Sequence, residues 1–329
     1  MKTGKLPTNR LMELLDKYKG SIRPEVMLAG KVGEDVSYIR TGDQTVVLST
    51  DPVTTAKSDL GTIAFNINMN DIATSGAEGL GVLVTILLPP GTGFDVIETI
   101  MAEINTQCLL HNLQILGGHT EVTDAVTRAV VSVTAVGLVP KGEEIYSGTL
   151  KPGDSLVVSK FLAIEGTMII ADLSRSKAKE VLTKKDLVRI KGYKDFLSVI
   201  PEGRIGKALK VHSMHDITEG GILGAVYEAV KASGVGCILD EEAFPFKKTT
   251  LRLTESLKLD PNRLISSGSM LFGTDQPKAL IKALAEQGID GTIVGQVQKD
   301  QEYLLLDPQG KLKAFDPPTK DEIYRIFER

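Results

Sequence analysis

Acidic residues recur along the chain where an apolar segment ends or is interrupted. Five of them stand in this context: Asp35, Asp51, Asp71, Glu121 and Asp216. A carboxylate within an apolar segment is costly unless it is paired, hydrogen-bonded or bound to a cation. Mg²⁺ takes oxygen ligands and is usually shared between a few carboxylates and nucleotide phosphates. Each acid taken singly fits a helix cap or a turn, but their recurrence in one context favours a divalent-metal site.

Two of the four histidines adjoin these acids. His119 stands two residues before Glu121, and His215 immediately precedes the last acid of the series. An imidazole beside a metal ion is suited to take a proton as a general base, so both histidines are candidate catalytic residues. One other interpretation stays open for each histidine. His119 could be only a hydrogen-bond partner of Glu121, and His215 could be a packed side chain at the end of a strand. His111 and His212 are expected to be structural.

The two common phosphate-binding loops are absent from the sequence. Gly-Lys pairs occur at 4–5, 30–31, 206–207 and 310–311, and none is followed by the Ser or Thr of a P-loop. The glycine pairs at 79–81 and 234–236 lack the third glycine of a dinucleotide-binding loop. Any nucleotide must therefore bind on a different scaffold.

Length and composition fit a cytoplasmic protein of two domains. The chain has 329 residues, of which 42% are hydrophobic and 24% charged, with a net charge of −4. This charge excludes a dominant phosphate-backbone binder, so no nucleic-acid partner is expected. The segment MKTGKLPTNR has no apolar core of a signal peptide, and the apolar stretch Val82–Leu88 is too short to cross a membrane. Cys108 and Cys237 lie in apolar segments and are expected to be small core residues.

A segment rich in glycine, proline and charge, 141–154, separates the two halves of the chain. It predicts an N-terminal domain over residues 1–147 and a C-terminal α/β domain over residues 148–329. Helical and strand-like patterns alternate in both halves. The expected fold class is therefore α/β (α+β), with two sandwich-like domains.

The candidate residues are expected to lie at the ends of regular elements. Apolar periodicity predicts a helix over 59–75, and Asp71 continues its apolar stripe. The run Val82–Leu88 predicts a strand buried on both faces. A short strand, 113–116, is expected to end at Gly117-Gly118, and the charged segment 172–193 is expected to be a helical insertion on the surface.

Six motifs in order carry a family resemblance. They are GED (33–35), STDP (49–52), NMNDIATSGA (68–77), GGHTE (117–121), SGTLKPGD (147–154) and HDITEGG (215–221). This order resembles the aminoimidazole ribonucleotide synthase superfamily, which includes hydrogenase-maturation carbamoyl dehydratases, thiamine-monophosphate kinases and selenophosphate synthetases. The resemblance extends from about Gly4 to Gly268.

The resemblance implies a homodimer whose N-terminal sheets form a shared β-barrel, with ATP and Mg²⁺ bound near the interface. It implies that Asp35, Asp51, Asp71 and Asp216 are linked to the metal, with Glu121 a weaker candidate. Thr50 and Asn70 would orient ligands or phosphates, and Gly117, Gly118 and Thr120 would bind the cofactor. Lys5 would close over the triphosphate, or it is a solvated terminal lysine.

Departures from the motifs bear on the subfamily. Carbamoyl dehydratases end in a tail with a terminal cysteine, and this sequence has no cysteine after Cys237. Selenophosphate synthetases use a cysteine or selenocysteine near the N-terminus, and none precedes Cys108. Thiamine-monophosphate kinases carry Asp-Ile-Ser-Asp-Gly where this chain has Asp-Ile-Thr-Glu-Gly-Gly. The double glycine resembles the dehydratase branch, and a relative of that branch without the tail is expected.

The expected function is ATP-dependent phosphorylation of an amide, carbonyl or carboxylate oxygen, as in a hydrogenase-maturation factor. The acceptor would be a small molecule or a group carried on a protein. Two alternatives remain open. The first is an ATP-binding maturation or regulatory partner without turnover, and the second is a small-molecule kinase similar to thiamine-monophosphate kinase.

Overall fold

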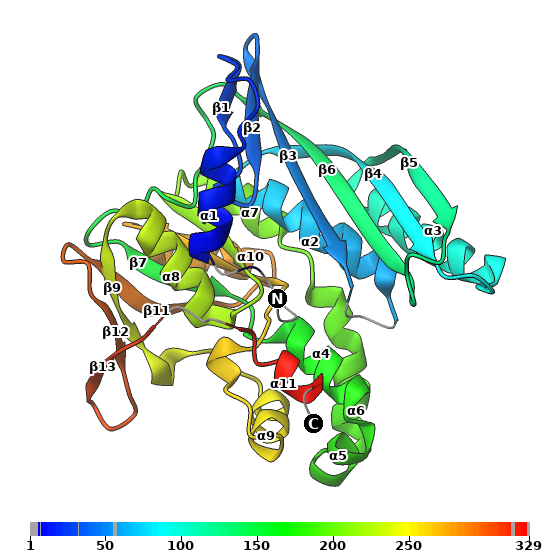
Figure 1. Ribbon diagram of the computed structural model, residues 1–329. Helices are drawn as coiled ribbons and strands as arrows, with labels where there is room; N and C mark the ends of the chain where they lie inside the picture. Colours follow the sequence, from blue (N-terminus) through cyan, green and yellow to red (C-terminus); the bar gives the residue numbers. More distant parts are fainter. Residues whose placement is uncertain (1–5, 7, 32, 55–57, 317–319, 328–329) are drawn as a thin grey trace. The chain divides into compact units, whose positions relative to one another are not determined.

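The computed structural model describes residues 6, 8–31, 33–54, 58–316 and 320–327. The chain divides into two compact units. The N-terminal unit consists of Arg23–Ala29 and Asp35–Glu144, and the C-terminal unit consists of Ile145–Arg329, Gly30–Glu34 and the chain up to Ile22. Each unit is mixed α/β around its own sheet (Figure 1), as expected for the fold class. The boundary at 147/148 stays a prediction.

The N-terminal unit is built on a six-stranded sheet with the order β1-β2-β3-β6-β4-β5. Its strands are β1 (Val26–Leu28), β2 (Ser37–Thr41), β3 (Gln44–Val53), β4 (Glu78–Leu88), β5 (Gln114–Val122) and β6 (Val130–Pro140). Neighbouring strands are antiparallel except β4 and β5, which are parallel. Helix α3 (Phe94–His111) makes the crossover that a parallel pair requires (Figure 1).

Helix α2 (Leu60–Thr74) forms the centre of the N-terminal unit. It packs against β3, β4 and β6 on one side and against α3. Almost all of its residues are therefore buried, including Asn68, Asn70 and Asp71. The expected single apolar stripe was too narrow a description, because a helix covered on several sides is buried all round.

Two strand predictions need correction. Strand β4 alternates between buried and more exposed residues, and Leu83 is 41% exposed, so it is not buried on both faces. Strand β5 does not end at Gly117-Gly118 but continues to Val122. These glycines have φ of 142° and 147°, and a Cβ on Gly118 would lie 1.8 Å from the carbonyl oxygen of Val84. Glycine is required here by close strand approach and not by a turn.

The C-terminal unit is built on a seven-stranded sheet with the order β13-β12-β9-β11-β7-β10-β8. Its strands are β7 (Ser155–Ser159), β8 (Ser213–Ile217), β9 (Gly236–Asp240), β10 (Ser269–Thr274), β11 (Gly291–Gln298), β12 (Tyr303–Leu306) and β13 (Leu312–Ala314). Its helices are α1 (Thr8–Lys17), α4 (Ile164–Leu173), α5 (Arg175–Val181), α6 (Lys184–Lys191), α7 (Ile200–Ala208), α8 (Gly221–Ser233), α9 (Lys248–Ser256), α10 (Pro277–Glu286) and α11 (Tyr324–Phe327). Short 3₁₀ turns are η1 (Gly192–Phe196), η2 (Glu241–Ala243) and η3 (Pro261–Arg263).

The core of the C-terminal unit lies between the sheet and α8. Apolar residues of α8, β7, β9 and β11 form one buried cluster. The charged segment 172–193 is a helical insertion, α5 followed by α6 and η1, and its charged side chains are largely exposed. Helix α6 begins with a capping box in which Thr183 and Asp186 satisfy each other's backbone N–H groups.

None of the helices within the described ranges is both long enough and apolar enough to span a lipid bilayer.

Candidate functional site

Asp71 is a buried carboxylate in the centre of the N-terminal unit. It is 3% exposed on α2, and the Ser49 hydroxyl of β3 donates a hydrogen bond of 2.5 Å to its Oδ2. The same hydroxyl lies 3.5 Å from Oδ1 of Asn68. The partner that a buried carboxylate requires is therefore Ser49 on β3, a residue of another element that the sequence around Asp71 does not reveal.

Asn68 ties α2 to the backbone at Asp51. Its Oδ1 accepts a hydrogen bond of 2.6 Å from the Asp51 N–H, and its Nδ2 donates to the Asp51 carbonyl at 3.2 Å. Nδ2 also donates to the carbonyl of Ala64 at 2.9 Å. The structure therefore brings the Asp51 backbone and Asp71 to the same contact between β3 and α2. The Asp51 residue itself is exposed, whereas Asp71 is buried.

The two polar neighbours of these acids differ in exposure. Thr50 lies on β3 and shares a hydrogen bond of 2.9 Å with the Thr134 hydroxyl of β6. Asn70 is fully buried on α2. Thr50 is therefore on the accessible surface of the sheet, and Asn70 lies in the packing between sheet and helices. Their roles toward a ligand stay predictions.

The GGHTE motif lies along the edge strand β5. The Nε2 atom of His119 is 3.1 Å from Oε2 of Glu121, and these side chains are 65% and 50% exposed. Gly117, Gly118 and Thr120 are exposed on the same strand. The structure thus agrees with the interpretation of His119 as a hydrogen-bond partner of Glu121, and it keeps both side chains open to solvent.

The GED motif contains a contact that the sequence did not reveal. Glu34 is 9% exposed and accepts a hydrogen bond of 3.0 Å from the N–H of Gly148. Gly33 has φ of 84°, and a Cβ there would lie 3.1 Å from the Glu228 carbonyl oxygen. Glu34 therefore has a structural role, whereas Asp35, the predicted metal ligand, is exposed.

His215 and Asp216 are both buried on β8 of the C-terminal unit, with exposures of 2% and 1%. The His215 Nδ1 atom is 3.3 Å from the Ser147 hydroxyl, and Nε2 is 3.2 Å from Oε2 of Glu228 on α8. The Ser147 hydroxyl also donates to the Met214 carbonyl at 3.0 Å. The imidazole is therefore held at both nitrogens, which fits a packed side chain and equally fixes the orientation of a base.

The double glycine of HDITEGG has a steric cause. Gly220 and Gly221 have φ of 93° and 62° at the start of α8. A Cβ on Gly221 would lie 2.6 Å from the carbonyl oxygen of Asn262. The Gly220 N–H donates a hydrogen bond of 2.7 Å to Oδ2 of Asp321. The motif is a tight turn onto α8 that only glycine can adopt.

Two buried acids in the C-terminal unit were missed by the sequence analysis. Burial raises the pKa of Glu165 to about 7; the adjacent Ser267 hydroxyl opposes this shift, and the charges of Asp321 and Glu219 increase it. Burial also raises the pKa of Asp321 to about 6, against the effect of backbone N–H donors. Both groups titrate close to neutral pH. Nothing in the local sequence distinguishes them from surface acids.

Asp51 and Asp71 in one unit, and His215 with Asp216 in the other, stay predicted ligands of a divalent cation. Oxygen donors at the end of β3 suit Mg²⁺, which retains waters and binds few protein carboxylates. Lys5 lies outside the described residues.

Comparison with known proteins shows matches along most of the chain. Residues 33–139 match the N-terminal domain of AIR synthase related proteins, and residues 151–306 match the C-terminal domain. A protein of Methanocaldococcus jannaschii named as a hydrogenase expression/formation protein is 26% identical over 303 residues, covering 89% of this chain and 88% of the relative. The carbamoyl dehydratase HypE of Rhodobacter capsulatus is 27% identical over 251 residues, covering 74% and 72%.

Solved structures share the fold. HypE in complex with ATP has a TM-score of 0.72 at 17% identity, covering 98% of this chain and 97% of HypE. ThiL complexed with AMPPCP and TMP has a TM-score of 0.76 at 18% identity and covers 98% of both chains. HypE in the HypE–HypF complex has a TM-score of 0.74 at 20% identity, covering 87% and 94%. The expected resemblance and the expected two-sheet fold are confirmed.

Proposed function

The chain belongs to the AIR synthase related family, and from that membership we propose that it is an ATP-dependent enzyme of the hydrogenase-maturation type. It phosphorylates an amide, carbonyl or carboxylate oxygen with the γ-phosphoryl group of ATP, and ADP leaves. Phosphate is then displaced or eliminated from the activated acceptor. The support is the family match over both halves of the chain and relatives named as carbamoyl dehydratases.

One observation carries the proposal at the level of residues. The Ser49 hydroxyl on β3 donates a hydrogen bond to the buried Asp71 carboxylate on α2. The Asn68 side chain on α2 forms hydrogen bonds with the Asp51 backbone on β3. Phosphoryl transfer depends chiefly on positioning and on neutralising phosphate charge. A rigid contact that presents acidic groups at the end of a strand is suited to both tasks, because it can hold Mg²⁺ without reorganisation.

The residues proposed to bind Mg²⁺ and to take part in phosphoryl transfer from ATP belong to the six sequence motifs. Asp51 and Asp71 are proposed as metal-linked carboxylates, together with Asp35, Asp216 and, more weakly, Glu121. When bound, Mg²⁺ would neutralise the charge that develops on the transferred phosphoryl group. His119 and His215 are proposed to accept a proton from the acceptor group.

The experiment compares wild type with Asp71→Asn. ATP with Mg²⁺ is expected to raise the melting temperature of the wild type, since a ligand that binds only the folded state stabilises it. Asp71→Asn is expected to lose most of the Mg²⁺-dependent part and to reduce release of ADP and phosphate by about 10²-fold or more. Acceptors tested include carbamoyl, amide and phosphate-ester compounds.

The matched control is Glu98→Gln, an exposed acid on α3 of the same unit. It is expected to keep both the thermal shift and the turnover of the wild type. Equal background hydrolysis in wild type and Asp71→Asn with every acceptor would reject the enzyme. A retained ATP shift in that case would favour an ATP-binding partner without turnover.

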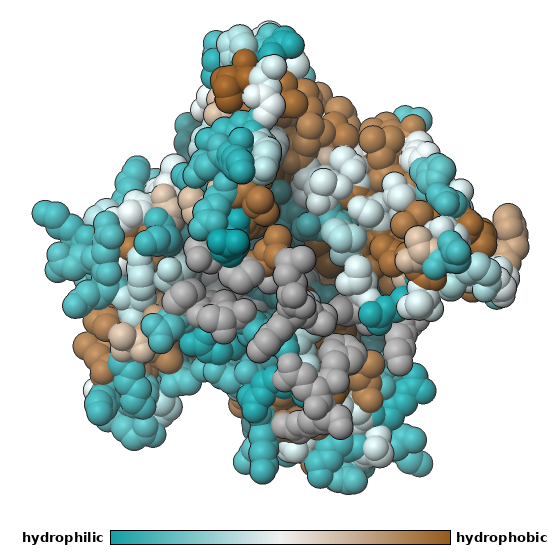
Figure 2. All heavy atoms as spheres, viewed as in Figure 1, coloured by the Kyte–Doolittle hydropathy of each residue, from teal (hydrophilic) through white to brown (hydrophobic). Residues whose placement is uncertain are grey.

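We also propose that the protein is a homodimer formed through its N-terminal units. Strand β5 is an edge strand, and edge strands are usually covered or blunted. Large apolar side chains on β4 and β5 are 41–56% exposed: Leu80, Leu83, Leu116 and Val122. Figure 2 shows hydrophobic side chains gathered over this sheet. A second copy is the occupant that would bury them, as in the shared barrel that the resemblance implies.

A protein partner and a cytoplasmic location complete the proposal. HypE, which shares this fold, has been solved in complex with HypF, and this supports a maturation partner for the present chain. Both cysteines are buried and unpaired, and burial raises the pKa of Cys108 to about 11 and of Cys237 to about 12. Unreactive, unpaired thiols suit a reducing compartment.

A further inference from the structure

Positive charge is concentrated in the helical insertion and α9. Residues 172–196 and 247–258 together hold twelve Lys or Arg and five Asp or Glu, a net charge of +7. The whole chain has a net charge of −4, so the remaining residues carry −11. Ordinary protein surfaces intersperse both signs. Within these two segments eleven of the twelve basic residues are exposed, against three of the five acids, so charge of one sign faces solvent.

These residues form one surface, which we call the basic surface: the exposed Lys and Arg of α5, α6, η1 and α9. Helix α5 packs against α9, and the Tyr193 hydroxyl of η1 lies 2.8 Å from the Thr249 hydroxyl of α9. The pKa of Asp186 is lowered first by the Thr183 hydroxyl and further by the charges of Arg189 on α6 and Arg252 on α9. Guanidinium groups of two helices therefore lie near one carboxylate.

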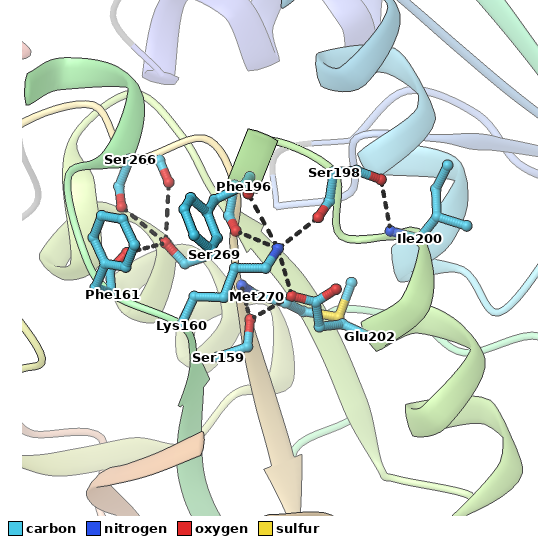
Figure 3. A network of polar contacts seen from close by, with 11 residues as sticks. Ser159, Lys160, Phe161, Phe196, Ser198, Ile200, Glu202, Ser266, Ser269 and Met270 are labelled. Carbon is cyan, nitrogen blue, oxygen red and sulfur yellow. Dashed lines mark hydrogen bonds and ion pairs between the residues drawn. The ribbon is translucent and has the colours of Figure 1, made fainter. Parts of the chain in front are cut away.

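The buried ion pair between Lys160 and Glu202 lies next to the end of η1, which is part of the basic surface (Figure 3). The Lys160 ammonium donates to the carbonyl oxygens of Phe196 at 3.1 Å and Ser198 at 2.5 Å, and so holds the end of η1. It also donates to the Gly268 carbonyl at 2.9 Å and lies 2.6 Å from Oε1 of Glu202 on α7. The end of η1 is therefore tied to α7 and to the turn before β10 through one ammonium group, which reduces the entropy that this segment loses when a partner binds.

Apolar side chains are interspersed among these cations. Val188 on α6 is 70% exposed, and Phe196 at the end of η1 and Leu251 on α9 are each 43% exposed. The ring of Phe196 packs edge-on against Phe161 at 5.5 Å between ring centroids, so its position is defined. Apolar anchors surrounded by charge are characteristic of protein interfaces.

The occupant with matching chemistry is an acidic protein segment that carries apolar residues. Nucleic acid would pair with the cations, but its phosphate backbone offers no apolar partner for the exposed side chains of Val188 and Leu251. An acidic segment that carries apolar residues matches both the cations and these side chains. Charge complementarity of this kind raises the association rate and selects the partner.

We propose that the basic surface on α5, α6, η1 and α9 is a docking site for an acidic, partly apolar segment of a partner protein. This inference does not depend on ATP chemistry. Several cations are available for it, because Lys179, Lys184, Lys185, Lys191 and Lys248 make no ion pair with any residue that the structure describes.

The test uses the full chain and a fluorescent amphipathic peptide of Glu and Leu. The variant is Lys184→Glu/Lys185→Glu/Lys248→Glu. These lysines are exposed in the first turns of α6 and α9, where acidic side chains favour the helix, so the fold is expected to persist. Fluorescence anisotropy is expected to show binding to wild type that weakens with salt, and a loss of affinity of about tenfold or more in the variant. If the variant does not fold, Lys179→Glu/Lys191→Glu replaces it.

The control Lys278→Glu/Lys282→Glu/Lys299→Glu makes the same change in net charge on exposed positions outside the basic surface. It is expected to keep the peptide affinity within about twofold, since distant charges are screened. An equal loss in both variants overturns the proposal, as does the absence of peptide binding at low salt. Tighter binding of single-stranded DNA or of phosphatidylserine vesicles than of the peptide also overturns it. The thermal shift with ATP and Mg²⁺ is measured in both variants, so a failure of the ATP site is recognised separately.

Discussion

Asp71 and Glu165 are two buried carboxyl groups with different surroundings. Both carboxylates are buried, with exposures of 3% and 2%. Asp71 receives a hydrogen bond from the Ser49 hydroxyl, whereas Glu165 lies near the negative charges of Asp321 and Glu219. Burial is the main cause that raises the pKa of Glu165 to about 7, and the neighbouring negative charges add to this shift against the effect of the Ser267 hydroxyl. The Glu165 carboxyl group is therefore expected to change its protonation state near neutral pH.

We predict that Glu165→Gln changes stability in a pH-dependent way. The pKa of Glu165 is raised from 4.5 to about 7 in the folded state, so the native state keeps a proton that the unfolded state releases between these values. Stability therefore falls as pH rises through this window, by at most about 3 kcal/mol. The amide cannot ionise, and the variant should gain stability relative to wild type at about pH 8 compared with about pH 5.

Urea denaturation at both pH values measures this gain. The exposed Glu98→Gln is the control, and its stability relative to wild type should not change with pH in this window. A difference between Glu165→Gln and wild type that is the same at both pH values would contradict the shifted pKa. Asp321, whose pKa is raised to about 6, adds a residual dependence of the same sign.

At the scale of elements, Lys160 connects β7, η1, α7 and the turn before β10. It follows β7 directly, with φ of 59°, and its side chain is 10% exposed beside Glu202, which is fully buried. Burial lowers the pKa of Lys160, and the Glu202 carboxylate opposes this shift. Ser159 at the end of β7 also donates to Glu202, at 3.1 Å. The ion pair between Lys160 and Glu202 therefore connects the four segments.

We predict that Lys160→Met destabilises the protein by about 3–5 kcal/mol, because it leaves the Glu202 charge buried without its partner. The double variant Lys160→Met/Glu202→Leu should recover a large part of this loss, since an apolar pair needs no desolvation of charge. Guanidinium denaturation measures the difference. The exposed Lys282→Met should have little effect. Equal destabilisation in the single and double variants would show that the carbonyl contacts of Lys160, and not the ion pair, stabilise this region.

The elements that could be predicted are those whose pattern is local. Apolar periodicity predicts a helix over 59–75, close to the observed bounds of α2. The sequence predicts the end of a strand at Gly117-Gly118, because paired glycines commonly mark a turn. In the structure β5 continues past them, and glycine is needed at Gly118 because the carbonyl of Val84 on the paired strand lies close to it. Contacts with a neighbouring strand cannot be predicted from the apolar periodicity of a short stretch of sequence.

The candidate site was predictable to the same degree. The acidic residues are predicted because they end or interrupt apolar segments, and His215 because it adjoins one of them. Of these residues, Asp71, His215 and Asp216 are buried, whereas the other three acids are exposed. Their partners were not identified. Ser49, Asn68 and Glu228 contact them from other elements, and such residues look ordinary in the sequence.

At the scale of the whole molecule, the exposed edge of β5 leads to a prediction about assembly. Sedimentation should give about twice 35.4 kDa at micromolar concentration, because a second copy would cover the apolar side chains of β4 and β5. Leu116→Glu/Val122→Glu should shift the protein toward the monomer, since it places charge in the interface.

Leu312→Glu is the control for this prediction. Leu312 is 48% exposed on β13 of the C-terminal unit, and its substitution should leave the sedimentation unchanged. A wild-type protein that sediments as a monomer would remove the homodimer. Dimers that persist in Leu116→Glu/Val122→Glu would place the interface on another surface.

The C-terminal unit is discontinuous along the chain, and this limits how the gene can be rearranged. Gly33 and Glu34 belong to that unit, although the chain enters the N-terminal unit at Asp35. Glu34 receives the hydrogen bond of Gly148, and Gly33 packs against the backbone of α8. A genetic exchange that replaced everything before residue 147 would also replace a contact of the later half. A chimaera joined at that boundary is therefore expected to lose these contacts of the C-terminal unit.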